Sequence, residues 1–135
     1  MVDSLRSSRL RFALRELALV AIGAVPGAVL RWQARVHLAP VLGGPAWADL
    51  LVNLIGSFLL GFLAGPIPRR ATLMPLLGIG FCGCLTTFSS WMFEVVMLLK
   101  AGHPAEGLLL IVVSVLLGVV SAAAGLQLSR RVLKA

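Results

Sequence analysis

The sequence predicts an all-α integral membrane protein with four transmembrane helices, the third of them broken in mid-span. The mean hydropathy is +1.01, and 59% of the 135 residues are hydrophobic whereas 13% are charged. Such values are typical of a membrane domain and not of a soluble one. Four apolar stretches, separated by short connections rich in glycine, proline or charge, account for most of the chain.

These stretches set the expected elements. We expect a basic N-terminal lead, a four-helix membrane domain and a basic C-terminal tail at residues 1–16, 17–128 and 129–135. The four spans are expected at about residues 17–37, 47–65, 71–99 and 105–128. The connections contain a Pro- and Gly-rich turn at residues 39–46, the turn PIPRR at residues 66–70 and a short link at residues 100–104.

A cleaved signal peptide is an alternative for the N-terminal region. Its basic start precedes an apolar stretch at residues 17–25, which is the order found in a secretory leader. The apolar stretch continues past Pro26 to Leu30 and carries polar residues that a discarded leader would not need. We therefore favour a retained first span.

The first span carries one face of small and basic residues at fourfold spacing, namely Gly23, Gly27, Arg31 and Arg35. Residues four apart lie on the same side of a helix, and glycines let another backbone approach closely. Because Arg31 lies deeper in the span, we expect it at an electropositive entry that gathers anions. Arg35 either faces protein or extends its side chain to the lipid headgroups.

The second span has a comparable face, made of Asp49, Asn53, Ser57, Gly61 and Gly65. An amide near the middle of a membrane needs a partner, because no water is available there. Asn53 therefore either bonds to a neighbouring helix or presents a donor to a permeating ion.

The third span contains an unusual stretch, GIGFCGCLTTFSSWMFE, at residues 78–94. With its flanks the span is 29 residues long, which is more than a hydrocarbon core of about 30 Å requires. Three glycines weaken the helix before residue 84, and Thr86 and Thr87 carry hydroxyls that compete for backbone partners. We expect a break near residues 82–86.

A break inside a membrane predicts a site, because irregular backbone is tolerated there only next to protein or a cavity. Carbonyl groups freed by the break are suitable ligands for a hard monovalent cation. Phe88, Trp91 and Glu94 follow at intervals of three and share one face of the second half-helix.

The fourth span has small and hydroxyl residues along one side, namely Ser114, Gly118, Ser121 and Gly125. The hydroxyl of Ser114 either joins a polar track or bonds to the carbonyl four residues earlier in its own helix.

The chemistry of the sequence excludes several function classes. The net charge of +7 is spread beside the apolar spans and forms no patch with interleaved aromatics, which argues against nucleic-acid binding. Cys82 and Cys84 suit neither a disulfide framework nor a zinc site and are expected to pack.

There is no metal-ligand cluster, no nucleophile with a base and no phosphate-binding loop, so we do not expect an enzyme. A channel or transporter remains, and because four short helices enclose almost no pore, at least two copies are needed.

Three segments resemble the Fluc/CrcB fluoride channels of microbial membranes: FCGCLTTFSSW in the third span, LVNLIGSFLLG in the second and GAVLR in the first. The resemblance covers the chain from Leu17 onward. It implies an antiparallel dimer with two fluoride pores and one central sodium ion that is structural and not transported. It also implies that backbone carbonyls of Gly83 and Thr86 hold this ion.

The resemblance further implies a set of pathway residues. By matched position these are Asn53, Phe88, Trp91, Ser114, Arg31 and Glu94, and Thr87 is a further hydroxyl donor beside them. Fluoride is small and tightly hydrated, so a pore has to replace its water with donors, while the positive edges of aromatic rings offer weak, easily released contacts. The expected function is export of fluoride across the cell membrane, which lowers cytoplasmic fluoride.

The sequence departs from the family pattern at three positions. Trp91 stands where the family usually has Phe, Cys84 where it usually has Gly, and Asp49 where it usually has Thr. Trp91 keeps an aromatic edge but is larger and adds an N–H donor. Asp49 adds a carboxylate that either repels an anion or pairs with an arginine. The fourth-helix tyrosine often found in the family is absent, since the chain has no Tyr.

Two other functions are alternatives. A small multidrug-type exporter of dual orientation would need a carboxylate within its first span, and none follows Glu16 there. A noncatalytic membrane interaction subunit would explain the small-residue faces but not the Thr-Thr-Phe break.

Charge predicts the orientation in the cell inner or plasma membrane. Nine basic residues belong to the two tails and the second connection: Arg6, Arg9, Arg11, Arg15, Arg69, Arg70, Arg130, Arg131 and Lys134. The other side has three, Arg31, Arg35 and Lys100, so both termini are expected in the cytoplasm. Expected partners are fluoride, membrane lipids and either a second copy or an oppositely oriented paralogue.

Overall fold

The computed structural model describes residues 2–68 and 70–133, with side chains from residue 7 onward in those ranges. Every regular element in this part of the chain is a helix. Four segments are long and apolar enough to cross a membrane: Ser7–Leu42, Pro45–Leu63, Arg70–Lys100 and Pro104–Leu133. The predicted all-α membrane class is therefore confirmed.

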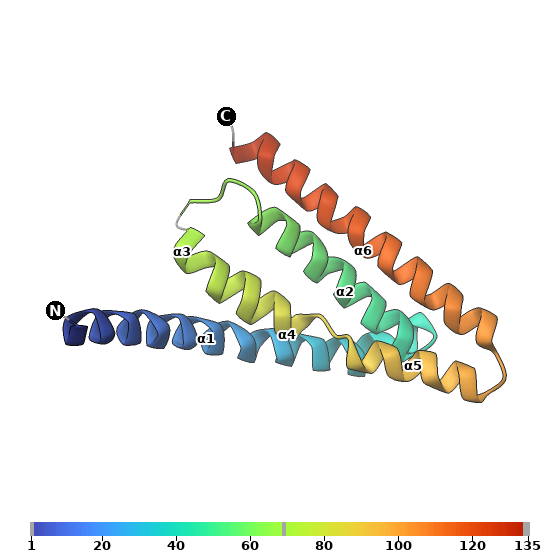
Figure 1. The fold of residues 1–135 in the computed structure, drawn as a ribbon. Helices are drawn as coiled ribbons and strands as arrows, with labels where there is room; N and C mark the ends of the chain where they lie inside the picture. The colour runs from blue at the N-terminus through green and yellow to red at the C-terminus, as the bar shows by residue number, and fades with distance from the viewer. Residues whose placement is uncertain (1, 69, 134–135) are drawn as a thin grey trace.

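Helix α1, Val2–Leu42, is the longest element (Figure 1). At about 1.5 Å per residue its 41 residues extend roughly 60 Å, about twice the thickness of a hydrocarbon core. The expected boundary between a basic lead and a first span is not visible in the backbone, because leucine, alanine and arginine all favour helix and the helix continues through residue 16. Arg15 Nη2 donates to Thr72 Oγ1 at 2.7 Å and ties the N-terminal part of α1 to the third segment.

The first connection is shorter than the sequence suggested. A turn was expected over residues 39–46, but only Gly43 and Gly44 leave the helical conformation. Their φ angles of +87° and +144° disfavour a residue with a Cβ. Pro40 remains inside α1, and Pro45 occupies the first turn of the next helix, where its missing N–H costs no helical bond.

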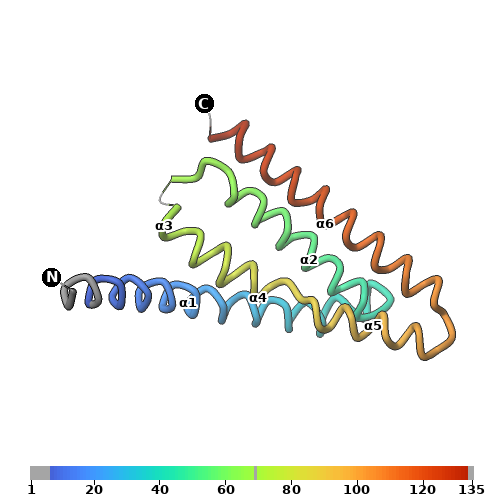
Figure 2. Tube along the Cα trace, viewed as in Figure 1, coloured from blue at the N-terminus to red at the C-terminus, as the bar shows by residue number. Residues whose placement is uncertain are grey.

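Helix α2, Pro45–Leu63, lies between α1 and helix α6, Pro104–Leu133 (Figures 1 and 2). The backbones of α2 and α6 approach so closely that a Cβ on Gly61 or Gly125 would overlap a carbonyl oxygen of the facing helix. Ser121 Oγ adds a hydrogen bond to the Leu54 carbonyl at 2.7 Å. Close packing of small residues, supported by a hydroxyl, is how helices associate in lipid.

The third segment consists of several short pieces. They are α3 (Arg70–Leu73), the π-helix η1 (Met74–Cys82), α4 (Gly83–Leu85) and, after residues 86–88, α5 (Ser89–Lys100). The segment packs against α1, where a Cβ on Gly27 would overlap the carbonyl oxygen of Phe81. Helical backbone continues to Leu85, so the interruption starts at Thr86, whose ψ of 154° is extended. It therefore lies C-terminal to most of the range 82–86 expected from the sequence.

The hydrogen bonds at residues 86–88 explain where helix stops. Thr86 N and Thr86 Oγ1 both donate to the Cys82 carbonyl at 3.0 Å, which closes the last turn of α4. The next amide, Thr87 N, donates at 2.7 Å to Asn53 Oδ1 on α2. In a continuous α-helix this amide would bond to the Gly83 carbonyl. A contact with another helix thus replaces one helical bond.

The start of α1 and the end of α6 lie at the same end of the bundle. Figure 1 shows the start of α1, residues 64–68 and the end of α6 on one side, and the turns after α1 and after α5 on the other. The outward face of α6 is apolar, with Leu108, Leu116 and Val120 each more than 60% exposed in the single chain. Such a face is suited to lipid or to a second protein surface.

Candidate functional site

An open groove of about 330 Å³ lies between α2, the interrupted third segment and α6. Of the nine residues expected at the site, seven line it: Asn53, Gly83, Thr86, Thr87, Phe88, Trp91 and Ser114. No Asp, Glu, Lys or Arg is among its lining residues. The groove therefore offers neutral donors, backbone and rings.

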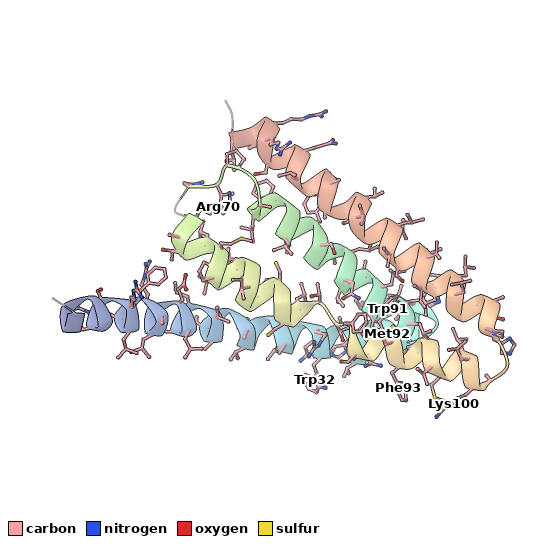
Figure 3. All side chains as sticks on the ribbon, in the orientation of Figure 1. Trp32, Arg70, Trp91, Met92, Phe93 and Lys100 are labelled. Atoms are coloured by element: carbon pink, nitrogen blue, oxygen red, sulfur yellow. The ribbon has the colours of Figure 1, made fainter. Side chains whose placement is uncertain are left out.

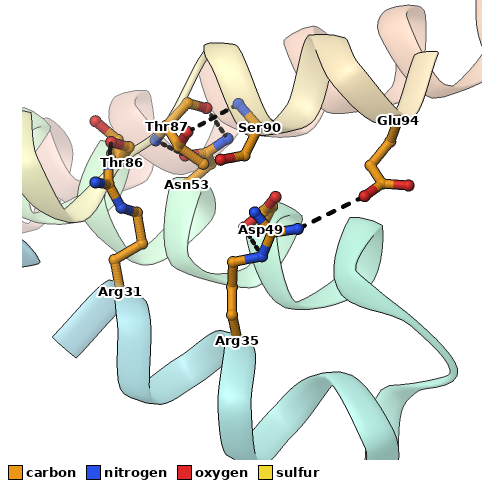
Figure 4. Close-up of polar contacts among 8 residues, drawn as sticks. All are labelled: Arg31, Arg35, Asp49, Asn53, Thr86, Thr87, Ser90 and Glu94. Carbon is orange, nitrogen blue, oxygen red and sulfur yellow. Dashed lines mark hydrogen bonds and ion pairs between the residues drawn. The ribbon is translucent and has the colours of Figure 1, made fainter. Parts of the chain in front are cut away.

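Arg31 and Glu94, the other two expected residues, do not line the groove. Arg31 Nη1 donates to the Thr86 carbonyl at 3.2 Å, so the arginine holds the backbone of the interruption from the α1 side. Glu94 Oε1 lies 3.6 Å from Arg35 Nη2. Figure 4 shows both contacts beside the bonds of Asn53.

Asn53 makes two hydrogen bonds to one residue of the interruption. Its Oδ1 accepts from Thr87 N at 2.7 Å, and its Nδ2 donates to the Thr87 carbonyl at 2.9 Å. The amide thus acts first as a helix-to-backbone contact. The amide nitrogen carries a second hydrogen that these two bonds do not use. Because Asn53 lines the groove, this hydrogen is a donor that remains at the site.

Thr87 is buried at 7% exposure and fastens the start of α5. Its Oγ1 accepts from Ser90 N at 3.3 Å, which satisfies one of the free amides in the first turn of that helix. Because the hydroxyl accepts in this bond, its hydrogen remains able to donate.

Two aromatic rings stand at the groove. The centroids of Phe88 and Trp91 are 5.7 Å apart with an interplanar angle of 56°, a tilted arrangement that aromatic pairs favour. Phe88 is 72% exposed in the single chain, whereas Trp91 is 7% exposed. The two rings meet as their spacing predicts, although Phe88 is the N-cap residue before α5 and Glu94 does not follow them into the groove.

Trp91 also reaches the fourth span. Its Nε1 donates to Ser114 Oγ at 3.0 Å. Ser114 Oγ accepts this bond from α5, and in the described part of the chain it makes no bond to a carbonyl of its own helix, which was the alternative from the sequence. The indole of Trp91, which departs from the family pattern, thus links α5 to α6. In Figure 3, Trp91 lies on the side of α5 that faces the bundle, whereas Phe93 on the same helix points away from it.

The family model for the CrcB-like protein, Camphor Resistance (CrcB), matches residues 18–126. The chain belongs to the CrcB family. A fluoride-specific ion channel FluC 2 from Synechococcus sp. (strain CC9902) is 48% identical over 133 residues, which cover 97% of this chain and 92% of the relative. Two relatives come from Parasynechococcus marenigrum (strain WH8102). A fluoride-specific ion channel FluC 2 is 50% identical over 92% of this chain and 88% of its own length. A fluoride-specific ion channel FluC 1 is 39% identical over 82% of this chain and 90% of its own length.

The sodium site implied by the family resemblance can be tested on its donor atoms. The bond from Thr87 N to Asn53 leaves the Gly83 carbonyl without that helical partner, and the Thr86 carbonyl accepts one bond, from Arg31. A carbonyl oxygen has two lone pairs, so both residues retain acceptor capacity. Among the described residues no group of three or more His, Cys, Asp or Glu side chains gathers to hold a metal. Backbone oxygens of this kind fit a hard monovalent cation.

Sequence reasoning missed part of this site in the CrcB family chain. Ser57 and Gly118 also line the groove, and their positions on the polar faces of the second and fourth spans were the available signal. Arg35 contacts both Asp49 and Glu94, a link between three helices that spacing along one helix does not reveal. Cys82 is buried among Leu63 and Ile67 and packs as expected.

Replacing Asn53 by Ala should lower the free energy of unfolding by about 2 kcal/mol or more, because Thr87 N and its carbonyl would both lose a partner. The measurement is SDS-driven unfolding in mixed micelles, followed by circular dichroism. Amide hydrogen exchange at Thr87 should also accelerate.

Ser57→Ala is the matched control for this change. Ser57 lies one turn further along α2 and lines the same groove, and its hydroxyl makes no hydrogen bond within the described part of the chain. Its removal should change stability by less than about 0.5 kcal/mol. Equal losses in the two variants would contradict the role assigned to Asn53.

Proposed function

We propose that this chain is the subunit of a fluoride-selective channel that exports fluoride across the cell membrane and so lowers cytoplasmic fluoride. The observation that carries the proposal is the composition of the groove. Hydroxyl and amide donors from Asn53, Thr87 and Ser114 share it with the exposed ring of Phe88, and no charged side chain lines it. The names of the relatives, which are fluoride-specific ion channels, support the same function.

Such a lining has the properties that passage of a small anion requires. Neutral donors replace water around the ion, and ring edges carry a partial positive charge that attracts it weakly. A lysine or arginine side chain in direct contact with the ion would bind it tightly and slow its release, and none lines the groove. The carboxylate-coupled drug exporter is less well supported, because no carboxylate lines the groove.

The groove is open along one side, so we propose that a second subunit closes it. Phe88 is 72% exposed in the single chain, which is a large apolar surface to leave uncovered beside an open groove. An antiparallel pair would bring two such grooves together and give two pathways.

Liposomes that contain the purified protein should release fluoride and not chloride. Chloride is larger and less strongly attracted to a sparse set of donors. Ion-selective electrodes measure both effluxes from vesicles loaded with the two salts. Equal rates for the two anions would rule the proposal out.

Phe88→Ile should lower fluoride efflux about threefold to tenfold, since an aliphatic side chain of similar bulk lacks the positive ring edge. Phe93→Ile is the control, because Phe93 lies on the same helix, is 61% exposed and does not line the groove. Its efflux should equal that of the unchanged protein. If both variants behave alike, the ring of Phe88 is a packing group.

We also propose that a structural sodium ion binds the carbonyls of Gly83 and Thr86 at the dimer centre. Ion binding to the assembled state would stabilise it by mass action. Exchange of sodium for N-methyl-D-glucamine on both sides of the membrane should therefore abolish fluoride efflux and lower the melting temperature. Unchanged efflux in rigorously sodium-free buffer would exclude the ion.

For the partner we propose an oppositely oriented paralogue. The charge bias along the sequence supports one orientation, with both termini in the cytoplasm. The presence of FluC 1 and FluC 2 in Parasynechococcus marenigrum (strain WH8102) supports the existence of such pairs.

Single cysteines added at each terminus should react only with reagents that enter the cytoplasm. The measurement is labelling of intact cells with an impermeant maleimide, with permeabilised cells as control. Substantial labelling of intact cells at either terminus would indicate dual insertion and favour a homodimer.

A further inference from the structure

Asp49 is a carboxylate with an unusual environment. It lies on α2 one turn before Asn53, is 0% exposed, and neither of its oxygens has a hydrogen-bond partner among the described residues. A buried charge is costly unless it is paired. The structure must therefore supply a countercharge.

Arg35 on α1 is that countercharge, and it is shared. Its Nε lies 3.7 Å from Asp49 Oδ1, and its Nη2 lies 3.6 Å from Glu94 Oε1 on α5. The arginine side chain is 35% exposed, so it is held in a partly buried position between three helices (Figure 4). One positive charge thus faces two negative charges.

The formal charges of the four residues beside the groove, Arg31, Arg35, Asp49 and Glu94, sum to zero. Arg31 lies one turn before Arg35 on the same helix face, and its guanidinium holds the Thr86 carbonyl. With Arg31, the cluster of Arg35, Asp49 and Glu94 contains two positive and two negative charges. The electropositive entry expected from the arginines alone is therefore cancelled.

The cluster is close enough to act on an ion in the groove. Asp49 is four residues from Asn53, and Glu94 is three residues from Trp91, so the two acidic residues lie about 6 Å and about 4.5 Å along their helices from a lining residue. At such distances, with an effective dielectric constant of about 20 as near a protein surface, one uncompensated charge changes the local anion concentration about tenfold or more.

We propose that Arg35 is a positioning and charge-balancing residue of the anion pathway. It holds Asp49 and Glu94 beside the groove and neutralises a charge that would otherwise repel the ion. The inference rests on the proposed function, because the anion it concerns is the one conducted there. Arg35 contacts no lining residue in the described part of the chain through a hydrogen bond or ion pair, so it acts through the two carboxylates.

Three variants separate charge from structure. Arg35→Gln leaves the cluster at −1, Asp49→Asn leaves it at +1, and the double variant returns it to zero. Fluoride efflux from liposomes should fall about tenfold in Arg35→Gln and rise above the unchanged rate in Asp49→Asn. The double variant should return to within about threefold of the unchanged rate. Arg130→Gln removes a positive charge at the far end of α6 and should leave efflux unchanged.

The salt dependence of efflux is a second measurement. If the role of Arg35 were purely structural, the deficit of Arg35→Gln would not depend on ionic strength. The deficit of Arg35→Gln should shrink when an impermeant salt raises ionic strength, because screening weakens repulsion between an ion and an uncompensated charge. Each of three results would overturn the inference. Efflux of Arg35→Gln could equal that of the unchanged protein, its deficit could be the same at low and high ionic strength, or the double variant could be as slow as Arg35→Gln.

The outcomes also distinguish this inference from the proposed function. If the unchanged protein conducts fluoride and the variants match it, the function stands and the role of Arg35 fails. If the unchanged protein conducts no fluoride, the function fails, and with it the charge-balancing role. The positioning role of Arg35 is then judged separately from melting temperatures. Because Arg35 and Asp49 are in contact, the decreases in melting temperature caused by Arg35→Gln and by Asp49→Asn should not add in the double variant.

Discussion

The pair of hydrogen bonds between Asn53 and the backbone of Thr87 is the interaction on which the site depends. Inside a bilayer a helix cannot stop unless the amides and carbonyls that it releases find other partners, since water is absent and each orphan group costs several kcal/mol. One amide side chain supplies a partner for the amide and for the carbonyl of Thr87. By doing so it diverts the Thr87 amide from the Gly83 carbonyl and sets the direction in which α5, with Phe88 and Trp91 at its start, leaves the interruption.

Neutral and charged groups are separated by about one helical turn. The groove holds donors and rings without charge, whereas Arg31, Arg35, Asp49 and Glu94 gather outside its lining. This arrangement combines weak ion contacts in the pathway with a balanced field beside it, and the two requirements conflict if the same residues must meet both. Trp91 links the groove to α6 through Ser114, so its indole N–H, which a phenylalanine lacks, has a structural use in this chain.

The features that are local in the chain could be predicted. Hydropathy gave the membrane class, and residues at fourfold spacing gave the faces on which Asn53, Ser57 and Gly61 lie. The motif around Thr86 and Thr87 located the groove, although helix persists to Leu85 because Thr86 itself closes the last turn on Cys82. The length of α1 was missed, since arginines that suggest a solvated lead are also good helix formers.

By itself, then, the sequence determined which four regions are long and apolar enough to cross a membrane and which face of each is polar, and it predicted an interruption in the third. These properties follow from transfer free energy and from the 3.6-residue period, which act within a segment. Only the tertiary structure decided the partners: that Asn53 bonds to Thr87, that Trp91 reaches Ser114, and that Arg35 lies between Asp49 and Glu94. Those contacts depend on how closely the backbones of different helices approach and at what register, and these are consequences of packing many side chains together that no single segment encodes.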